Sequence, residues 1–146
     1  MSDRTATPAT ATAANGAANG VTEATVASAD VTIGEYLDTW NETDAARRQA
    51  GIARAWAPSG SYRDPLMASD GHAGIDAMLA GVQAKFPGFV LKRTSKGDCH
   101  NATARFAWSL GPAAGPAIVE GVDFCALAPD GRLASVVGFI DKMPQG

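Results

Sequence analysis

The strongest constraint on the fold is a change of hydrophobic spacing at Pro87-Gly88. Before this pair, large apolar residues recur every three or four positions, which is the spacing of one face of an α-helix. After it, apolar and polar residues tend to alternate, which is the spacing of a half-buried β-strand. The sequence therefore predicts helices first and a run of strands afterwards, within one α+β domain.

Three helices are expected before this change. Their candidate start positions, in chain order, are Asp30, then Thr43 or Asp44, then Asp70 or Gly71. Their apolar stripes are Ile33, Tyr36, Leu37 and Trp40; Ile52, Ala55 and Trp56; and Ile75, Met78, Leu79, Val82 and Phe86. The second helix is expected to stop before Pro58, because proline cannot continue a helix.

The expected strands cover residues 59–64, 89–95, 101–110, 117–128 and 132–140, with a loop at 67–71. Lys96-Gly97-Asp98 is expected as a turn, and Pro129-Asp130-Gly131 as a tight hairpin turn. The resulting order, α-α-β-α-β-β-β-β, predicts three helices beside a curved, mostly antiparallel sheet.

Composition and charge limit the domain organisation, the partners and the cellular location that the sequence predicts. Residues 1–28 are rich in Ala, Thr, Asn and Gly and bury too little to offset their ordering entropy, so we expect a disordered tail and one domain at 29–146. The net charge is −3 without a basic stripe, and no long apolar run occurs, so we expect no nucleic acid and no membrane as partner. The cysteines and histidines lack metal-site spacing, so we expect no metal and no cofactor. Without a secretory signal, a reduced cytoplasmic protein is the simpler interpretation, although a disulfide between Cys99 and Cys125 stays open.

Two aspartates stand out. Asp64 ends the strand Ser61-Tyr62-Arg63-Asp64 just before Pro65, so it either starts a turn or faces a pocket between helices and sheet. Asp123 has apolar neighbours on both faces of its strand, so it is either buried or reaches water at an edge.

The element order, the Tyr62-Arg63-Asp64-Pro65 strand end and the Gly131-Arg132-Leu133 hairpin resemble the nuclear-transport-factor-2-like (NTF2-like) superfamily. Within it, the chain is most similar to SnoaL-like and ketosteroid-isomerase-like proteins. This resemblance covers roughly residues 30–141 and implies a cone-shaped, cystatin-like fold, with the three helices packed on the curved sheet.

The resemblance also implies catalytic roles for three residues. Tyr36, followed by Asn41 and Asp44, matches the helix that carries the isomerase's oxyanion-binding tyrosine. Asp64 matches its general base, and Asp123 matches its second oxyanion group by its spacing from the hairpin glycine. Such a site moves a proton next to a carbonyl group and stabilises the enolate that forms.

Bulky side chains argue for a substrate smaller than a steroid. The residues expected to line the substrate pocket are Trp40, Tyr62, Phe106, Trp108 and Cys125; plain core packing is the alternative for the aromatic rings and the thiol. The expected function is an isomerase, cyclase or dehydratase for a small hydrophobic carbonyl compound. The alternatives are a non-catalytic ligand-binding or dimerisation module and, third, an epoxide hydrolase. A homodimer is expected through the outer sheet face, where Val122 and Phe124 lie.

Overall fold

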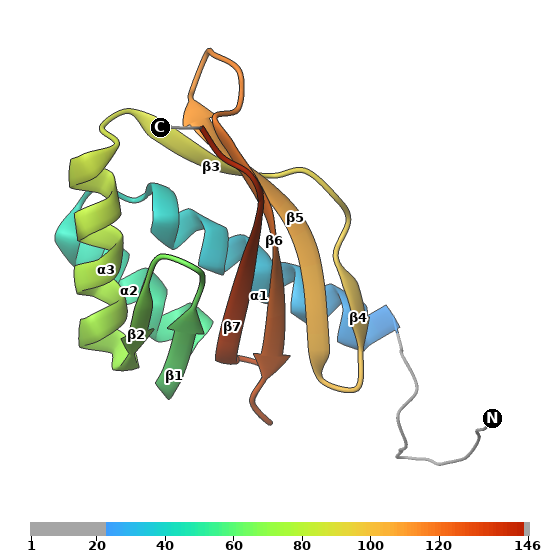
Figure 1. The fold of residues 1–146 in the computed structure, drawn as a ribbon. Helices are drawn as coiled ribbons and strands as arrows, with labels where there is room; N and C mark the ends of the chain where they lie inside the picture. Colours follow the sequence, from blue (N-terminus) through green and yellow to red (C-terminus); the bar gives the residue numbers. More distant parts are fainter. Residues whose placement is uncertain (1–22, 145–146) are drawn as a thin grey trace, which may run out of the picture.

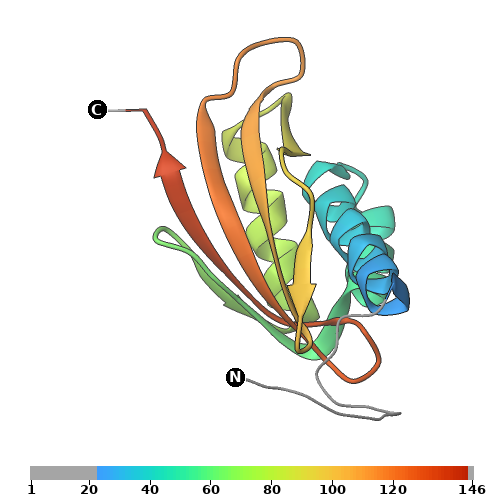
Figure 2. The ribbon, with the colours of Figure 1, turned by 90° about the vertical axis from the view of Figure 1, so that its right-hand side faces the viewer.

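Helices cover one face of a single curled sheet. The computed structural model describes residues 23–144, and Figure 1 shows three helices against a seven-stranded sheet. In Figure 2 the helices all lie to one side of the strands, and the sheet curls around them. This is the α+β architecture, with three helices on a curved sheet, that the sequence predicts.

The elements follow the predicted order with two additional short strands. The helices are α1 (Glu23–Asn41), α2 (Ala45–Ala55) and α3 (Gly71–Lys85). The strands are β1 (Trp56–Arg63), β2 (Ala68–Asp70), β3 (Phe89–Arg93), β4 (Asp98–His100), β5 (Thr103–Pro112), β6 (Val119–Leu127) and β7 (Leu133–Lys142). The strand order is β2-β1-β7-β6-β5-β3, with β4 paired to β5.

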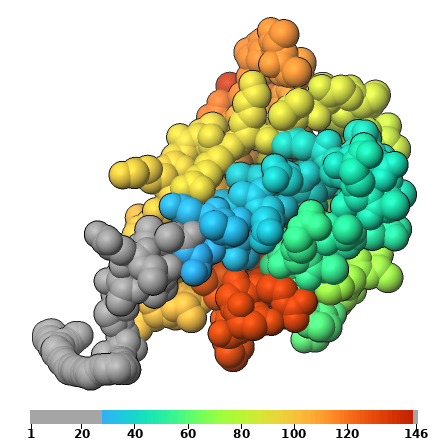
Figure 3. All heavy atoms as spheres, turned by 180° about the vertical axis from the view of Figure 1, so that it is seen from behind, coloured from blue at the N-terminus to red at the C-terminus, as the bar shows by residue number. Residues whose placement is uncertain are grey.

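Helix α1 is longer than predicted. It begins at Glu23 rather than at a cap on Asp30, whose carboxylate instead pairs with Arg93 of β3 at 2.8 Å. The expected tail at 1–28 lies mostly outside the described residues, and its last part belongs to α1. Seen from behind in Figure 3, α1 (blue) and α2 (cyan) lie between the β3–β4 region (yellow) and the turn before β7 (red).

The prediction that Trp56 belongs to the second helix is wrong. Asp44 caps α2 as expected, by accepting a 2.9 Å hydrogen bond from the Arg47 amide. The helix ends at Ala55, and Trp56 has extended backbone angles and begins β1. Pro58 explains the early end, because its ring disfavours helix in the preceding residues. Pro58 also falls where the β1–β7 register shifts, as expected for a proline within a sheet.

Two three-residue strands were predicted as turns or loops. Strand β2 pairs with β1, and β4 pairs with β5 through a turn in which Asn101 and Ala102 both have positive φ, 49° and 58°. Strand β5 therefore begins at Thr103 and not at Asn101. An alanine in this conformation is uncommon, so the residue types gave no hairpin signal there.

The sheet is mixed. Every pairing is antiparallel except that of β1 with β7, which is parallel. Strand β7 thus lies between β1, which follows the first two helices, and β6, which follows the change of spacing. The hydrophobic core fills the space between the helices and the sheet.

Within residues 23–144, no helix has the length and apolar character needed to cross a membrane.

Candidate active site

Asp123 is enclosed and hydrogen-bonded from two sides. Its exposed fraction is 2%, so the alternative of an edge position in water is excluded. The Tyr36 hydroxyl donates to its Oδ2 at 2.7 Å, and the Trp108 indole N–H donates to its Oδ1 at 3.0 Å. Tyr36 comes from α1 and Trp108 from β5, so the carboxylate ties a helix to the sheet.

Burial changes the acidity of this carboxyl group. Desolvation raises the pKa of Asp123 from 3.8 to about 6, because the charged form loses its hydration. The hydrogen bonds from Tyr36 and Trp108 act in the opposite direction, and the charge of Asp64 adds to the increase. Burial, followed by the charge of Asp123, raises the pKa of the Tyr36 hydroxyl well above its ordinary value. Tyr36 is therefore a neutral hydrogen-bond donor.

Glycines make room for this arrangement. A Cβ at Gly121 would clash with the backbone carbonyl oxygen of Phe139 and would lie 2.5 Å from Cζ2 of Trp108, so a side chain there would displace both the strand and the indole ring. A Cβ at Gly138 would lie 2.8 Å from Oδ1 of Asp123. Both glycines stand within strands, where glycine often marks the close approach of another group. This signal was present in the sequence, but alone it does not indicate which group approaches.

Asp64 starts a turn and also accepts a hydrogen bond from the side chain of Tyr62. Its Oδ1 accepts hydrogen bonds from the amides of Leu66 and Met67 at 2.7 and 2.8 Å, as expected of an aspartate that starts a turn. Its Oδ2 accepts a 2.7 Å hydrogen bond from the Tyr62 hydroxyl. Three donors therefore fix the orientation of this half-buried carboxylate.

The two acids and Tyr62 lie around Gly138, and Tyr36 joins them through its hydrogen bond to Asp123. From its Cβ position, Oδ1 of Asp123 is 2.8 Å away, Cβ of Asp64 is 3.4 Å away and the Tyr62 hydroxyl is 3.6 Å away. Burial raises the pKa of Tyr62 above its ordinary value, with further contributions from the charges of both aspartates. The structure therefore brings together two tyrosine–aspartate pairs from three segments of the chain, namely α1, the end of β1 and β6.

Aromatic rings contact both tyrosines of these pairs. Tyr36 makes edge contacts with the rings of Trp40, Trp56 and Phe106, at centroid distances of 6.3, 5.9 and 6.0 Å. The ring centroids of Trp40 and Tyr62 are 5.7 Å apart.

The Cys125 thiol is buried on the same face of β6 as Asp123, and burial raises the pKa of this thiol above its ordinary value. Cys99 and Cys125 are both free thiols, so the open alternative of a disulfide is excluded.

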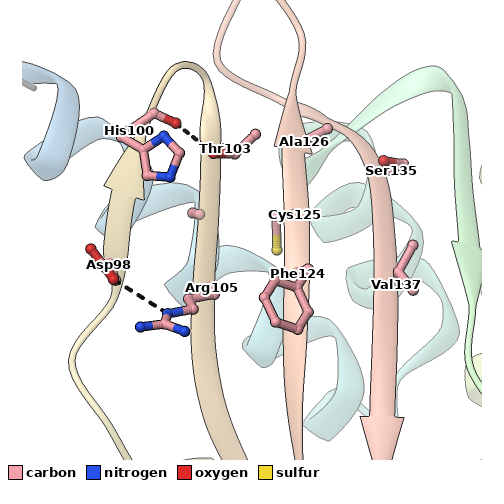
Figure 4. Close-up of a pocket in the computed structure, with 10 residues that line it drawn as sticks. Asp98, His100, Thr103, Arg105, Phe124, Cys125, Ala126, Ser135 and Val137 are labelled. Atoms are coloured by element: carbon pink, nitrogen blue, oxygen red, sulfur yellow. Dashed lines mark hydrogen bonds and ion pairs between the residues drawn. The ribbon is translucent and has the colours of Figure 1, made fainter. Parts of the chain in front are cut away.

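A separate hollow lies against strands β4 to β7. It has a volume of about 510 Å³, and Figure 4 shows the Asp98–Arg105 ion pair and the Phe124 ring in it. None of the three candidate catalytic residues lines it. Residues 23–144 contain no cluster of three side chains arranged to hold a metal ion.

Comparison with known proteins finds structural relatives. A candidate isomerase of the SnoaL-like family from Agrobacterium tumefaciens strain C58 is 36% identical, with a TM-score of 0.75, over 79% of this chain and 98% of its own. A candidate SnoaL-like polyketide cyclase from Jannaschia species CCS1 is 15% identical, with a TM-score of 0.64, over 84% and 91%. A protein of unknown function with a cystatin-like fold, from Methylobium petroleophilum PM1, is 20% identical, with a TM-score of 0.65, over 82% and 79%. No family model and no curated protein gives a significant match.

Proposed function

The chain belongs to the SnoaL-like family of NTF2-like proteins, and on this basis we propose that it catalyses proton transfer on a small hydrophobic carbonyl compound. The reaction is of the isomerase, cyclase or dehydratase type. The observation that carries the proposal is the approach of Asp64 and Asp123 to one point, Gly138, from different environments. Two carboxyl groups held in different environments are the usual basis for dividing the roles of base and acid.

Asp64 is the proposed base. Its carboxylate removes a proton from the carbon next to the carbonyl group, and the electron pair of that C–H bond moves into the carbonyl system to give an enolate. In an isomerase, Asp64 returns the same proton to another carbon. The hydrogen bonds from Tyr62 and from two backbone amides hold its carboxylate in one orientation for both steps.

Asp123 is the proposed acid that stabilises the enolate oxygen. Its raised pKa, about 6, keeps part of the population protonated near neutral pH, and only the protonated form can donate a hydrogen bond to that oxygen. Tyr36 and Trp108 hold the group in place. Tyr36 was expected to act directly on the oxyanion; because its hydroxyl already binds Asp123, we assign it first to positioning that acid.

Exchange of a substrate proton tests the role of Asp64 directly. The protein is incubated in D₂O with small enones such as 2-cyclohexenone, and deuterium uptake next to the carbonyl is followed by NMR. The Asp64→Asn variant should lose the catalysed exchange. Asp98→Asn is the matched control, since Asp98 is an exposed aspartate of β4 that pairs with Arg105. Equal exchange rates in Asp64→Asn and the unchanged protein would reject Asp64 as the base.

A non-catalytic ligand-binding module of the same fold is the second candidate. One observation favours it: Tyr36, Trp108 and Asp123 satisfy one another's hydrogen bonds, which also describes a purely structural polar core. Binding of enones or phenols without any exchange would select this candidate.

We also propose a cytoplasmic location for the protein. Its two cysteines are buried free thiols, which fit a reducing compartment, and cell fractionation tests this location.

We also propose that two copies associate through the outer face of the sheet. Phe124, Val137 and Phe139 are 43%, 39% and 54% exposed on neighbouring strands, and the two phenylalanine rings contact each other at 5.8 Å. A cluster of exposed apolar side chains is typical of an interface. Sedimentation should give twice the chain mass of 14.9 kDa, and Phe139→Glu should halve the measured mass. A single-chain mass for the unchanged protein at micromolar concentration would exclude the dimer.

A further inference from the structure

We propose that the indole N–H of Trp40 donates a hydrogen bond to an oxygen atom of the bound ligand, a carbonyl, enolate or phenolate oxygen. The inference rests on the proposed function in one respect, that a ligand binds beside the two tyrosine–aspartate pairs. It adds a ligand-binding donor that the family resemblance did not assign.

The indole nitrogen of Trp40 is buried without a partner. No hydrogen-bond acceptor among the described residues satisfies Nε1 of Trp40. A buried donor left unsatisfied costs about 1–3 kcal/mol, and most buried polar groups in folded proteins are therefore paired. A donor in this state is ready for an acceptor that arrives with a ligand.

The position of the ring connects it to the site. Trp40 lies one helical turn after Tyr36 on α1, and their ring centroids are 6.3 Å apart. It also contacts Tyr62, with ring centroids 5.7 Å apart, and the Tyr62 hydroxyl donates a hydrogen bond to Asp64. Trp40 therefore adjoins both tyrosine–aspartate pairs. Its side chain is only partly buried, whereas Tyr36 and Tyr62 are almost completely enclosed.

The donors of the neighbouring groups are already committed. The Tyr36 hydroxyl and the Trp108 N–H both bind Asp123, and the Tyr62 hydroxyl binds Asp64. To accept a hydrogen bond from one of these three donors, a ligand oxygen would have to displace the carboxylate of Asp123 or Asp64. Trp40 can donate without that exchange, and its N–H does not titrate, so its contribution is the same at every working pH.

Trp56 provides a matched comparison. Its Nε1 is also buried without a partner, and its ring also contacts Tyr36, at 5.9 Å. However, Trp56 is 1% exposed and begins β1 in the core. Replacing either tryptophan by phenylalanine removes one unpaired N–H and the same amount of ring, so the difference between the variants isolates contact with the ligand.

The test uses 4-nitrophenol, whose phenolate mimics an enolate and whose absorbance reports binding. Trp40→Phe should raise its Kd about tenfold, the effect of losing one hydrogen bond in a protected site, while Trp56→Phe should change it less than about twofold. In ¹H–¹⁵N spectra, the Trp40 indole proton, assigned by its loss in Trp40→Phe, should move downfield when 4-nitrophenol is added. Far-UV circular dichroism establishes that both variants are folded.

Several results would overturn the inference: equal Kd values for Trp40→Phe and the unchanged protein, equal losses in both variants, or no binding of 4-nitrophenol by the unchanged protein. Failure of the proposed function gives a different pattern. In that case 4-nitrophenol binds and depends on Trp40, yet the protein catalyses no deuterium exchange into enones.

Discussion

Asp64 and Asp123 meet across a strand that separates them in the sheet. Asp123 of β6 is directly opposite Gly138 of β7 in the antiparallel register, and Asp64 follows the residue paired with Val137 in the parallel register. Because the residue between them has no side chain, both acids lie against the same backbone carbon. The geometry of the candidate site therefore depends on one position that contributes no functional group.

A methyl group at that position should damage the site. Gly138→Ala places its Cβ 2.8 Å from Oδ1 of Asp123, closer than real contacts of this kind, so the carboxylate or the strand must shift. We expect a loss of about 1–3 kcal/mol in unfolding free energy from this overpacking, together with a larger proportional loss of exchange activity. Urea unfolding and the NMR exchange assay measure the two effects.

The control for this variant is another glycine-to-alanine change. Gly81 lies inside α3 with open space around its Cβ position, so Gly81→Ala should stabilise the protein by about 1 kcal/mol and leave exchange unchanged. Full activity in Gly138→Ala would show that Asp123 and Asp64 do not need their observed separation.

Asp123 should make stability depend on pH in a defined direction. Its folded pKa, about 6, lies above the unfolded value, so its contribution is fully present below about pH 3.8 and is lost as pH rises through 6. Between about pH 3 and pH 7, the unchanged protein should lose about 3 kcal/mol relative to Asp123→Asn. Denaturant unfolding of both proteins across this range measures the difference. A constant difference would mean that Asp123 titrates normally in the folded protein.

The same titration should control activity. If protonated Asp123 stabilises the enolate, the exchange rate at limiting enone concentration should decline as pH rises past about 6, since the deprotonated group cannot donate. In Asp123→Asn the amide stays a donor at all these pH values, so the decline should disappear even if the rate is lower. An unchanged decline in that variant would assign the titration to another group.

Arg48 should be important for stability and not for chemistry. Its side chain is 6% exposed, binds Asp76 of α3 at 2.6 Å and also donates to Gln83, so it joins α2 to α3. Arg48→Ala leaves Asp76 without its charge partner and should cost about 3–5 kcal/mol in urea unfolding. Arg47→Ala, which removes an exposed ion pair with Glu42, should leave the midpoint unchanged. Equal effects of the two changes would contradict this account.

The sequence predicted the fold more completely than the site. Period-two alternation left Asp123 either buried or at an edge in water, and the structure shows it buried. The Tyr36–Asp123 hydrogen bond joins positions 87 residues apart, which no local pattern reveals. Trp108 was interpreted as bulk in a pocket, yet it donates to Asp123, because a buried indole N–H usually finds a partner. Trp56 was predicted in the second helix, but Pro58 ends that helix earlier. Ala102 was predicted within a strand, but it has a positive φ that is uncommon for alanine.

The central place of β7 has a consequence for biosynthesis. Strand β7 leaves the ribosome after the other six described strands and is inserted between β1 and β6. Until it arrives, the amino-terminal helices with β1 and the later hairpin strands have no shared sheet, and their pairing edges stay open to other chains. A nascent polypeptide that stalls before residue 133 would thus be both inactive and prone to aggregate, which gives molecular chaperones a defined window in which to act.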